Sequence, residues 1–508
     1  MSPARLRALV VLALTAGPAA ASGTDYWAYQ YKNIDVTVAG SSDYARNVAR
    51  NADRLGAALS RILNLKSAAR LPTHIYVLAD EQIVELLGSS GSSNYNSSGY
   101  DATVIASRGR GGDDAYWGVY FGYVGSLLAG DGGMRYPYWL RLGVPEVFAT
   151  TQFDHDRIRT GAIAPGYALT LASGTPIPLR TFLGMQEQDP QLQAGPPHEM
   201  YAAESWYLTR EILVEGRHRD EFSRYLGLLH QGRSERAAFA ASFNVSYEDL
   251  DRMLREDQRT SGHVFVLASP TDERLEAAPP RKLSPLEVKT CLALINLRAG
   301  RRAQALHLVD DALRDDPANE QALRVAAQAQ LEEGNYLASF AAVDQLSRGA
   351  LSPDGMAESA AILTVLASAV SGGHAVLGVD AQKLLRYAQR YYQGAIDANP
   401  DDLRSWAGLA GLYGAQRDRT AAQSLLPAAS QALARHPSNV NLAYALTHMC
   451  AQTQQWECAA EFASAWRENA LTEPSRAEAA AFESRLSTYR RRLASAPAAD
   501  SIPLPTQR

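Results

Sequence analysis

The chain has 508 residues, which is too long for one ordinary domain, and we expect two or three domains. Hydrophobic residues make up 46% of it and charged residues 20%, so most of the chain can bury a core. The formal charge of −5 gives no general attraction to nucleic acid or to an anionic membrane surface, and we predict neither as a partner.

Residues 1–21 have the pattern of a secretory signal peptide. Arg5 and Arg7 precede a short apolar run, and small residues surround an expected cleavage point after Ala21. The apolar run is shorter than the ~20 residues that a membrane-spanning helix needs, so we expect no stable membrane insertion. No cysteine stands at the cleavage point, which argues against a lipid anchor there. The pattern therefore predicts export.

The segment that follows alternates strand and helix patterns. We expect strands at residues 33–40, 73–80 and 102–107, a long helix at 42–65 and a short helix at 81–87. Residues 88–101 (GSSGSSNYNSSGYD) predict a flexible loop, because Ser, Gly and Asn neither pack nor favour one backbone state. Helical patterns then run from 200 to 254, and 264–269 predicts one more strand. Strands first and helices after indicate an α+β domain over residues 26–268.

Residues 119–153 predict two helices that are separated by a Gly-rich break, the second opening on Trp139. Gly118, Gly122 and Gly125 lie at i, i+4 and i+7 of the first helix. They give that helix one smooth face, against which a neighbouring element can pack closely.

Residues 269–285 are charged and Pro-rich, which is typical of a linker. Beyond them the chain is Ala-rich and helical, and an internal repeat appears. Ala293 and Gly300 recur 34 residues later as Ala327 and Gly334. This spacing resembles the tetratricopeptide repeat family, in which small residues let two antiparallel helices cross closely. The resemblance covers residues 286–474, with about five repeats in an all-α solenoid, and we expect a disordered tail at 490–508.

A stacked repeat array presents a concave surface built from the first helix of each unit. The residues that the repeat register places there are Arg324, Gln328, Arg404, Asn441, Tyr444 and His448. This surface is mixed in charge and carries no signature for a particular ligand. The repeats therefore predict a protein or peptide partner, and the alternative is that these side chains are solvated surface.

Three cysteines are too few for a disulfide framework or a Cys-x-x-Cys zinc site. Cys450 and Cys458 are close enough in sequence to pair across a helix–turn–helix, since export into an oxidising space permits one bond. Cys291 would then be a free thiol. Three buried thiols are the alternative.

The domain over residues 26–268 resembles the gluzincin-like (peptidase MA-like) domains that bacteria often fuse in front of tetratricopeptide repeats. The resemblance rests on the order of THIYVLAD, the helix pair of 119–153, the turn in TPIPLRTFL (175–183) and the helix MYAAESWYLTREIL (200–213). It implies a zincin-like fold. The fusion of such a domain to tetratricopeptide repeats implies a bacterial envelope protein, in the periplasm or outside the cell.

In that family the helix pair would read H-E-x-x-H and then W-x-x-E-G-x-x-E. The two histidines and a glutamate hold zinc, and the glutamate beside the first histidine is the general base. The resemblance places Phe121, Gly122, Gly125 and Leu142 at these four working positions. None of them offers a lone pair, so we expect no metal and no other cofactor. A Gly-rich core helix without peptidase ancestry is the alternative.

Two functions from different classes remain after this reasoning. The first is an exported, non-catalytic pseudopeptidase whose repeats bind a protein or peptide. The second is an active hydrolase that uses a non-zinc or an unrecognised metal site. Asp154-His155-Asp156 and His198-Glu199 are the acid–imidazole groups considered for it, but neither completes a known motif. Whether the chain is an enzyme stays open, and the lost motif favours that it is not.

Overall fold

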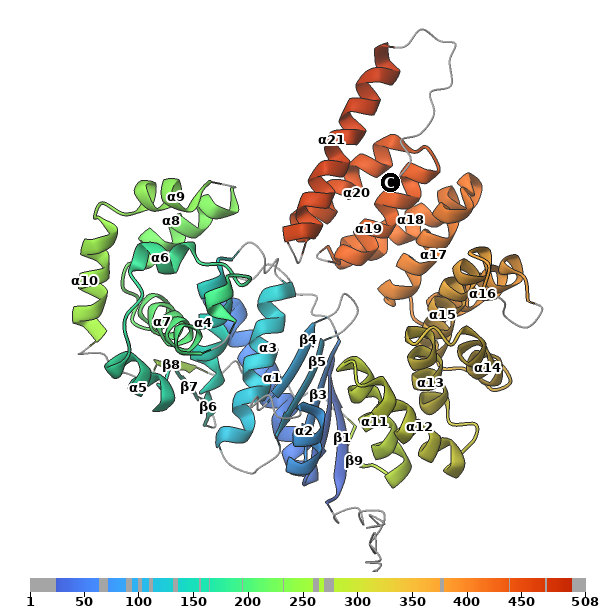
Figure 1. The fold of residues 1–508 in the computed structure, drawn as a ribbon, viewed down its shortest axis with the longest axis horizontal. Helices are drawn as coiled ribbons and strands as arrows, with labels where there is room; N and C mark the ends of the chain where they lie inside the picture. The colour runs from blue at the N-terminus through green and yellow to red at the C-terminus, as the bar shows by residue number, and fades with distance from the viewer. Residues whose placement is uncertain are drawn as a thin grey trace, which may run out of the picture.

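The computed structural model describes residues 24–495 apart from short segments (64–71, 88–93, 99–102, 109–112, 131–135, 155–156, 164, 194, 232, 259–264, 269–277, 375–378, 438 and 471–472). The predicted signal peptide lies outside the described residues. Figure 1 shows a sheet with its helices at the N-terminal end and an arc of paired helices that follows it.

A six-stranded mixed sheet organises the N-terminal domain, in the order β4-β5-β3-β2-β1-β9. Its strands are β1 (Tyr26–Tyr31), β2 (Ile34–Ala39), β3 (Thr73–Leu78), β4 (Asn94–Ser98), β5 (Thr103–Arg108) and β9 (Arg281–Lys282). β2, β3 and β5 run parallel to one another, whereas β1, β4 and β9 pair antiparallel with their neighbours. Two of these strands depart from our expectation.

β4 lies inside the stretch that we predicted to be a flexible loop. Asn94–Ser98 pairs antiparallel with β5, from Asn94 opposite Ser107 to Ser98 opposite Thr103. As an edge strand it has a ladder on only one described side, so it does not need the apolar alternation that marks a central strand. β9 similarly lies inside the predicted linker, where it pairs with β1.

Alternate strand residues divide between the two faces of the sheet, as the pleat requires. Val36, Ile75 and Ile105 are fully buried against α1 (Ser42–Ile62) and α3 (Asp113–Gly130). Tyr76 and Val104 point to the other face. Both faces are therefore covered by helices.

The second face is covered by α2 (Asp80–Leu87) and by α11 (Pro285–Arg298), the first helix of the repeat array. Leu283 and Ile295 are buried there with strand residues of the sheet. Tyr95 on β4 donates its hydroxyl to the carbonyl oxygen of Arg298 at 2.6 Å. The segment that we assigned to a linker thus attaches the repeats directly to the sheet, because apolar residues on both sides are buried together.

The rest of the N-terminal domain is helical and surrounds Trp139, which is fully buried. Its helices are α4 (Tyr138–Ala149), α5 (Pro165–Ser173), α6 (Leu179–Gly184), η2 (Pro190–Leu192), α7 (Pro196–Leu213), α8 (Arg219–His230), α9 (Glu235–Ser242) and α10 (Tyr247–Gln258). A small antiparallel sheet joins β6 (Gln152–Phe153), β7 (Arg157–Thr160) and β8 (Phe265–Ala268). These layers agree with the predicted α+β class, while kinship with zincins stays a prediction.

Five antiparallel helix pairs follow in the part of the chain that is described, and they form the tetratricopeptide-type solenoid that the 34-residue offset predicts. They are α11 with α12 (Arg302–Asp315), α13 (Glu320–Glu332) with α14 (Tyr336–Leu346), α15 (Pro353–Ser371) with α16 (Ala381–Ala398), α17 (Leu403–Gln416) with α18 (Arg419–Arg435), and α19 (Val440–Gln452) with α20 (Trp456–Asn469). The helices of the third pair have 19 and 18 residues, against 14 in each helix of the first pair. This lengthening explains why the repeat fades in the sequence.

The same backbone turn ends the first helix of every described pair. It requires a left-handed residue, and the positions are Gly300 (φ 75°), Gly334 (φ 77°), Gly373 (φ 97°), Arg417 (φ 54°) and Gln454 (φ 61°). In each turn the next amide donates to a carbonyl of the preceding helix, as Arg301 does to Asn296 at 2.8 Å. Glycine adopts this conformation without strain, whereas Arg417 and Gln454 do so at a cost.

α21 (Glu473–Ser495) closes the array by packing on α20. Residues 490–495, which we expected to belong to a disordered tail, are its last helical residues. The structure describes nothing beyond Ser495. No helix among the described residues is long and apolar enough to cross a bilayer.

Candidate functional site

The four positions of the predicted metal site lie on α3 and α4, which pack against each other. Phe121 is half-buried and stacks on Trp117, with ring centroids 5.2 Å apart. Leu142 is half-buried against the domain core. The side chains at these positions therefore serve packing.

Glycine lets neighbouring elements approach α3 at this place. A Cβ on Gly122 would lie 3.0 Å from Cγ2 of Ile105 on β5, and Asn96 of β4 donates its amide to the Gly122 carbonyl at 3.5 Å. A Cβ on Gly125 would meet Asn96 at 3.7 Å and Pro145 at 3.9 Å. The close approach predicted for the glycine face is confirmed at Gly122.

Gly143 on α4 is packed still more tightly. A Cβ there would overlap the carbonyl oxygen of Ser205 and the hydroxyl of Thr209, both on α7. The α4–α7 contact is thus a close backbone crossing, and there is no room between these helices for a ligand.

Glu146, which matches the last glutamate of the pattern W-x-x-E-G-x-x-E, is a buried residue of α4. Burial raises the pKa of its carboxyl to about 7, and a hydrogen bond with Tyr167 opposes this only in part. Its Oε2 has no hydrogen-bond partner among the described residues. Because no basic side chain among the described residues pairs with the carboxylate, this position suits a protonated, structural acid.

No group of three or more His, Cys, Asp or Glu side chains that could hold a metal ion occurs among the described residues. His155 and Asp156 lie outside them. His198 is placed at the start of α7, where its Nδ1 lies 2.8 Å from the carbonyl oxygen of Leu192. This contact gives His198 a structural role.

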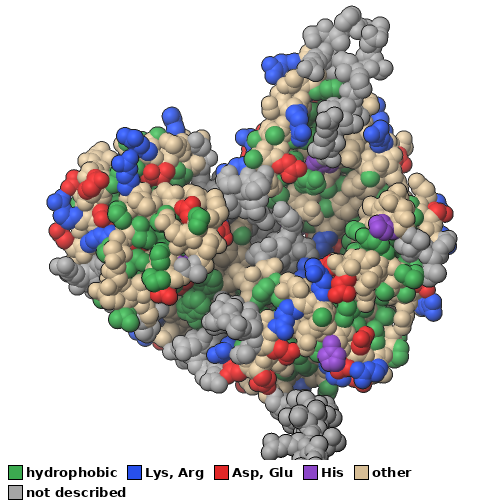
Figure 2. Space-filling model, viewed as in Figure 1, with side chains coloured by type: hydrophobic (Ala, Val, Ile, Leu, Met, Phe, Trp, Pro, Cys, Tyr) green, Lys and Arg blue, Asp and Glu red, His purple; other side chains and the backbone are tan. Residues whose placement is uncertain are grey.

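A groove of about 970 Å³ runs along the repeats and takes its lining from α11, α13, α15, α17 and α19, the first helices of the five pairs. We call it the repeat groove. Figure 2 shows this face of the molecule hollowed between the N-terminal domain and the repeats. All six predicted residues line it: Arg324, Gln328, Arg404, Asn441, Tyr444 and His448. The structure thus brings them together, and their binding role stays a prediction.

The floor of the repeat groove is made largely of small residues. Ala357 and Ala361 of α15 lead to Ala407, Gly408 and Gly411 of α17. A Cβ on Gly411 would meet nothing within 4 Å. The floor is therefore open down to the helix backbone.

Arg324 and Arg404 do not stand free in the groove, because each joins neighbouring repeats through ion pairs. Arg324 donates to both carboxylate oxygens of Glu358, from Nε at 2.7 Å and from Nη2 at 2.6 Å. Arg404 donates to Asp354 at 2.5 Å and to Asp402 at 3.0 Å. These partially buried pairs fix the stacking of three successive repeats.

Sequence reasoning missed three kinds of groove residue. Glu358 lies 34 residues after Arg324, so the repeat period itself pointed to the pair. Tyr392 belongs to a second helix, yet it reaches the groove beside Gly408. Ser97 belongs to β4, and no local signal in the predicted loop could have placed it there.

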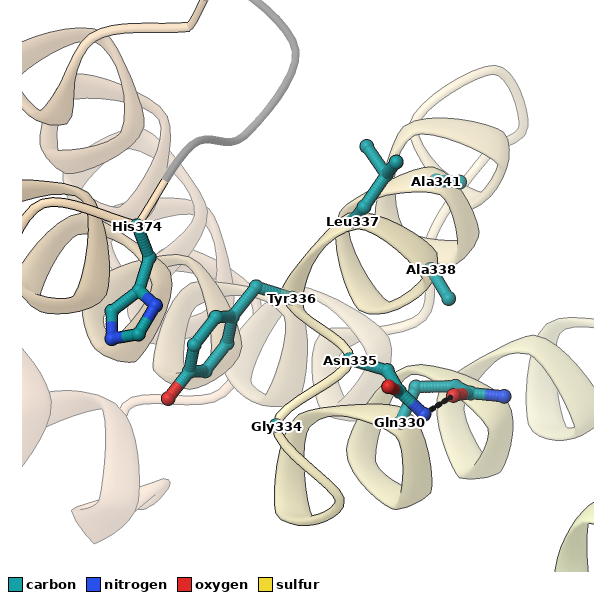
Figure 3. Close-up of a pocket in the computed structure, with 8 residues that line it drawn as sticks. All are labelled: Gln330, Gly334, Asn335, Tyr336, Leu337, Ala338, Ala341 and His374. Atoms are coloured by element: carbon teal, nitrogen blue, oxygen red, sulfur yellow. Dashed lines mark hydrogen bonds between the residues drawn. The ribbon is translucent and has the colours of Figure 1, made fainter.

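A second hollow, of about 590 Å³, opens between the turn of the second repeat and the end of α15. Figure 3 shows Tyr336 and His374 on one side of it, while the Asn335 amide donates to Gln330 Oε1 on the other. The ring centroids of Tyr336 and His374 lie 4.9 Å apart, edge to face. Leu337 is exposed. No charged side chain lines this hollow among the described residues, so it offers less for recognition than the repeat groove.

Cys450 and Cys458 form a disulfide that joins α19 to α20, with Cα atoms 5.8 Å apart. Cys291 is a free thiol at the contact between α11 and the sheet, and burial raises its pKa to about 11. The thiol is therefore protonated at neutral pH and is unsuited to be a nucleophile.

Comparison with known proteins finds no matching protein family and no matching curated protein. Solved structures similar to part of the chain include YrrB, a tetratricopeptide-repeat protein with an unusual peptide-binding site (15% identity, 38% of this chain and 89% of that one, TM-score 0.29). TTC0263 of Thermus thermophilus is similar at 18% identity over 39% of this chain and 98% of that one, with a TM-score of 0.32. PilW, a type IV pilus biogenesis factor, is similar at 17% identity over 42% and 93%, with a TM-score of 0.30.

Proposed function

We propose that this chain is an exported, non-catalytic protein whose repeat groove binds a polypeptide segment of a partner in the cell envelope. The observation that carries this proposal is the groove itself, since five successive repeats contribute one connected lining from Leu294 to Gln452. The groove's volume of about 970 Å³ lies within the ~300–1,000 Å³ usual for small-ligand pockets, so its extent and not its volume indicates the occupant. A surface that extends over five repeats suits a chain segment better.

The composition of the groove agrees with such an occupant. Its floor exposes backbone at Gly411, whereas Gln328, Asn441 and Gln452 supply amide donors and acceptors along its walls. Amide side chains can pair with the main chain of any sequence. The ion pairs of Arg324 and Arg404 hold neighbouring repeats together. Because each arginine is paired with a carboxylate, the groove does not present charge of one sign only.

The non-catalytic part of the proposal is supported by how the predicted metal site is filled. Phe121, Gly122, Gly125 and Leu142 offer no ligand atoms, and β4 and β5 approach Gly122 closely. An ancestral peptidase that lost its zinc is our interpretation of this place. An active hydrolase with another site remains the competing function.

Export is supported by the signal-peptide pattern and by the bond between Cys450 and Cys458. Disulfides persist in oxidising compartments such as the periplasm. We therefore place the partner in the envelope.

Photo-cross-linking in an envelope extract tests the binding role. A cross-linker at Gln328, in the groove wall, is expected to capture a defined polypeptide from the extract. Gly411→Trp should abolish that product, because the indole fills space that is open in the wild type. Gly227→Trp is the matched control, since a Cβ on this helical glycine of α8 also meets nothing within 4 Å. Equal capture by both variants would contradict binding in the groove.

Zinc content separates the two functions. We expect the purified chain to hold no stoichiometric zinc and to cleave no protein substrate. Stoichiometric zinc together with proteolysis that a chelator blocks would establish the hydrolase instead.

A further inference from the structure

The repeat groove ends at the last repeat in an exposed aromatic ring. Tyr444 on α19 is 39% exposed, although it lies among apolar neighbours. Its ring centroid is 4.3 Å from the imidazole of His448 and 4.9 Å from the indole of Trp466, which meets it edge to face. Trp466 is itself fixed, being buried and donating from Nε1 to Ser475 Oγ at 3.1 Å. The tyrosine ring is thus held in place from beneath and open to the groove.

α21 packs against the same rings. Its Phe482 packs on His448 with ring centroids 5.3 Å apart. We call the four rings of Tyr444, His448, Trp466 and Phe482 the aromatic end. The Nε2 atom of His448 is buried and has no hydrogen-bond partner among the described residues. The part of the aromatic end that a ligand can reach is therefore the exposed ring of Tyr444.

Glu478 and Arg485, both on α21, place one negative and one positive charge near the aromatic end. Glu478, one turn before Phe482 on α21, is exposed, and no ion pair joins it to a described residue. Burial raises the pKa of Tyr444, and the charge of Glu478 adds to this effect. Burial lowers the pKa of His448, with Glu478 opposing and Arg485 assisting. The lowered pKa favours the neutral imidazole, so Glu478 is the charged group of this cluster that attracts a cation.

We propose that the aromatic end is the seat for one basic side chain, arginine in preference to lysine, of the polypeptide bound in the repeat groove. This inference rests on the proposed function. A cation over the face of a tyrosine ring is attracted by the ring quadrupole, and Glu478 supplies the counter-charge. An apolar side chain would leave Glu478 unmatched. A guanidinium has five N–H donors in a planar fork, so it can stack on Tyr444 and still donate to the carboxylate of Glu478.

A random peptide library displayed on phage and selected on the full-length chain tests the seat. Among peptides that no longer bind Gly411→Trp, we expect arginine or lysine to be enriched at one fixed position. Tyr444→Leu and Glu478→Gln should each weaken such a peptide by about 2- to 30-fold, the range that cation–π contacts give. Tyr444→Phe keeps the ring and should bind within about twofold. Tyr387→Leu is the matched control, because Tyr387 on α16 is 38% exposed and lies outside the groove lining.

The outcomes distinguish this inference from the proposed function. Groove-dependent peptides with no basic position, or with an acidic one, overturn the inference and leave the proposed function standing. A library that yields no groove-dependent peptide overturns both. A direct probe is the titration of N-acetyl-arginine amide while the His448 ring resonances are followed by NMR. We expect them to shift, and to shift much less with the neutral norleucine amide; equal shifts or none would contradict the seat.

Discussion

Glycine has opposite effects in two regions of this molecule. In α3 and α4 it allows close packing, because Gly122 lies tightly against the Ile105 side chain of β5 and Gly143 meets the backbone of α7 with no space for a Cβ. In α17 Gly411 leaves the backbone open to the repeat groove. The same residue therefore closes the place where the family resemblance predicts a metal cleft and keeps open the place where we expect a partner. A glycine allows close packing where a neighbouring element lies against it, and it leaves open space where none does.

The two regions also differ in how they use charge. Glu146 is buried on α4 and has no basic partner among the described residues, and its pKa is raised to about 7. In the repeats, Arg324 and Glu358 compensate each other across two adjacent units. The first arrangement favours a protonated acid, whereas the second favours charged groups at neutral pH. This difference makes the N-terminal domain the more pH-sensitive part.

The largest expected effect is a loss of stability when a methyl group is added at Gly143, which is packed more tightly than Gly122. Gly143→Ala should lower the free energy of unfolding by about 2–3 kcal/mol, because the new methyl group must displace α7 at Ser205. Urea denaturation followed by tryptophan fluorescence measures it. Gly227→Ala, with open space around its Cβ, should leave stability unchanged or slightly raised. Equal stability of both variants would mean that the α4–α7 crossing is not close.

The second effect depends on pH. The pKa of Glu146 is about 7 in the folded protein and ordinarily 4.5, so the folded state holds this proton more tightly than the unfolded state. Stability is consequently highest below about pH 4.5 as far as this group is concerned, and it falls as pH rises toward 7. Glu146→Gln should therefore stabilise the protein at pH 8 by roughly 1–3 kcal/mol and have little effect at pH 4.

Denaturation curves at pH 4, 6 and 8 would check this dependence. Glu204 on α7 also has its pKa raised to about 7 by burial, so the slope should decrease in the variant but not vanish. Glu248→Gln, at an exposed position of α10, is the control. A gain that is the same at all three pH values would contradict a raised pKa.

The smallest expected effect concerns the glycines in the turns of the repeats, which are needed for their positive φ and not for close packing. Gly334→Ala should destabilise the repeats by about 1 kcal/mol, since its φ of 77° strains any side chain. Arg417→Gly, at the equivalent turn with φ 54°, should stabilise them by about 0.5–1 kcal/mol. Thermal unfolding of the two variants gives the comparison. Changes of the same sign in both would show that the turns are not equivalent.

The repeats were the part that the sequence predicted best. Ala293 and Ala327 are fully buried at helix crossings, and Gly300 and Gly334 are both left-handed, so each conserved requirement of the unit appears directly as a residue type. The later turns use Arg417 and Gln454, which tolerate the strain and hide the period.

Less of the N-terminal domain could be predicted, because tertiary contacts decide it. β4 is polar and becomes a strand only because β5 offers it a pairing edge. The docking of α11 depends on Leu283 and Ile295 meeting the sheet, a contact between segments that are more than 200 residues apart. The positions of the six groove residues followed from helical register, whereas the ion pairs that hold two of them needed the neighbouring repeats in place.

Hydrogen exchange of the full-length chain with and without a groove-dependent peptide tests the central claim most directly. We predict that the peptide protects amides in α13, α17 and α19 and leaves α3 and α4 unchanged. Protection confined to α3 and α4, with none in the repeats, would show that the partner binds in the N-terminal domain and would contradict a closed cleft beside an open groove.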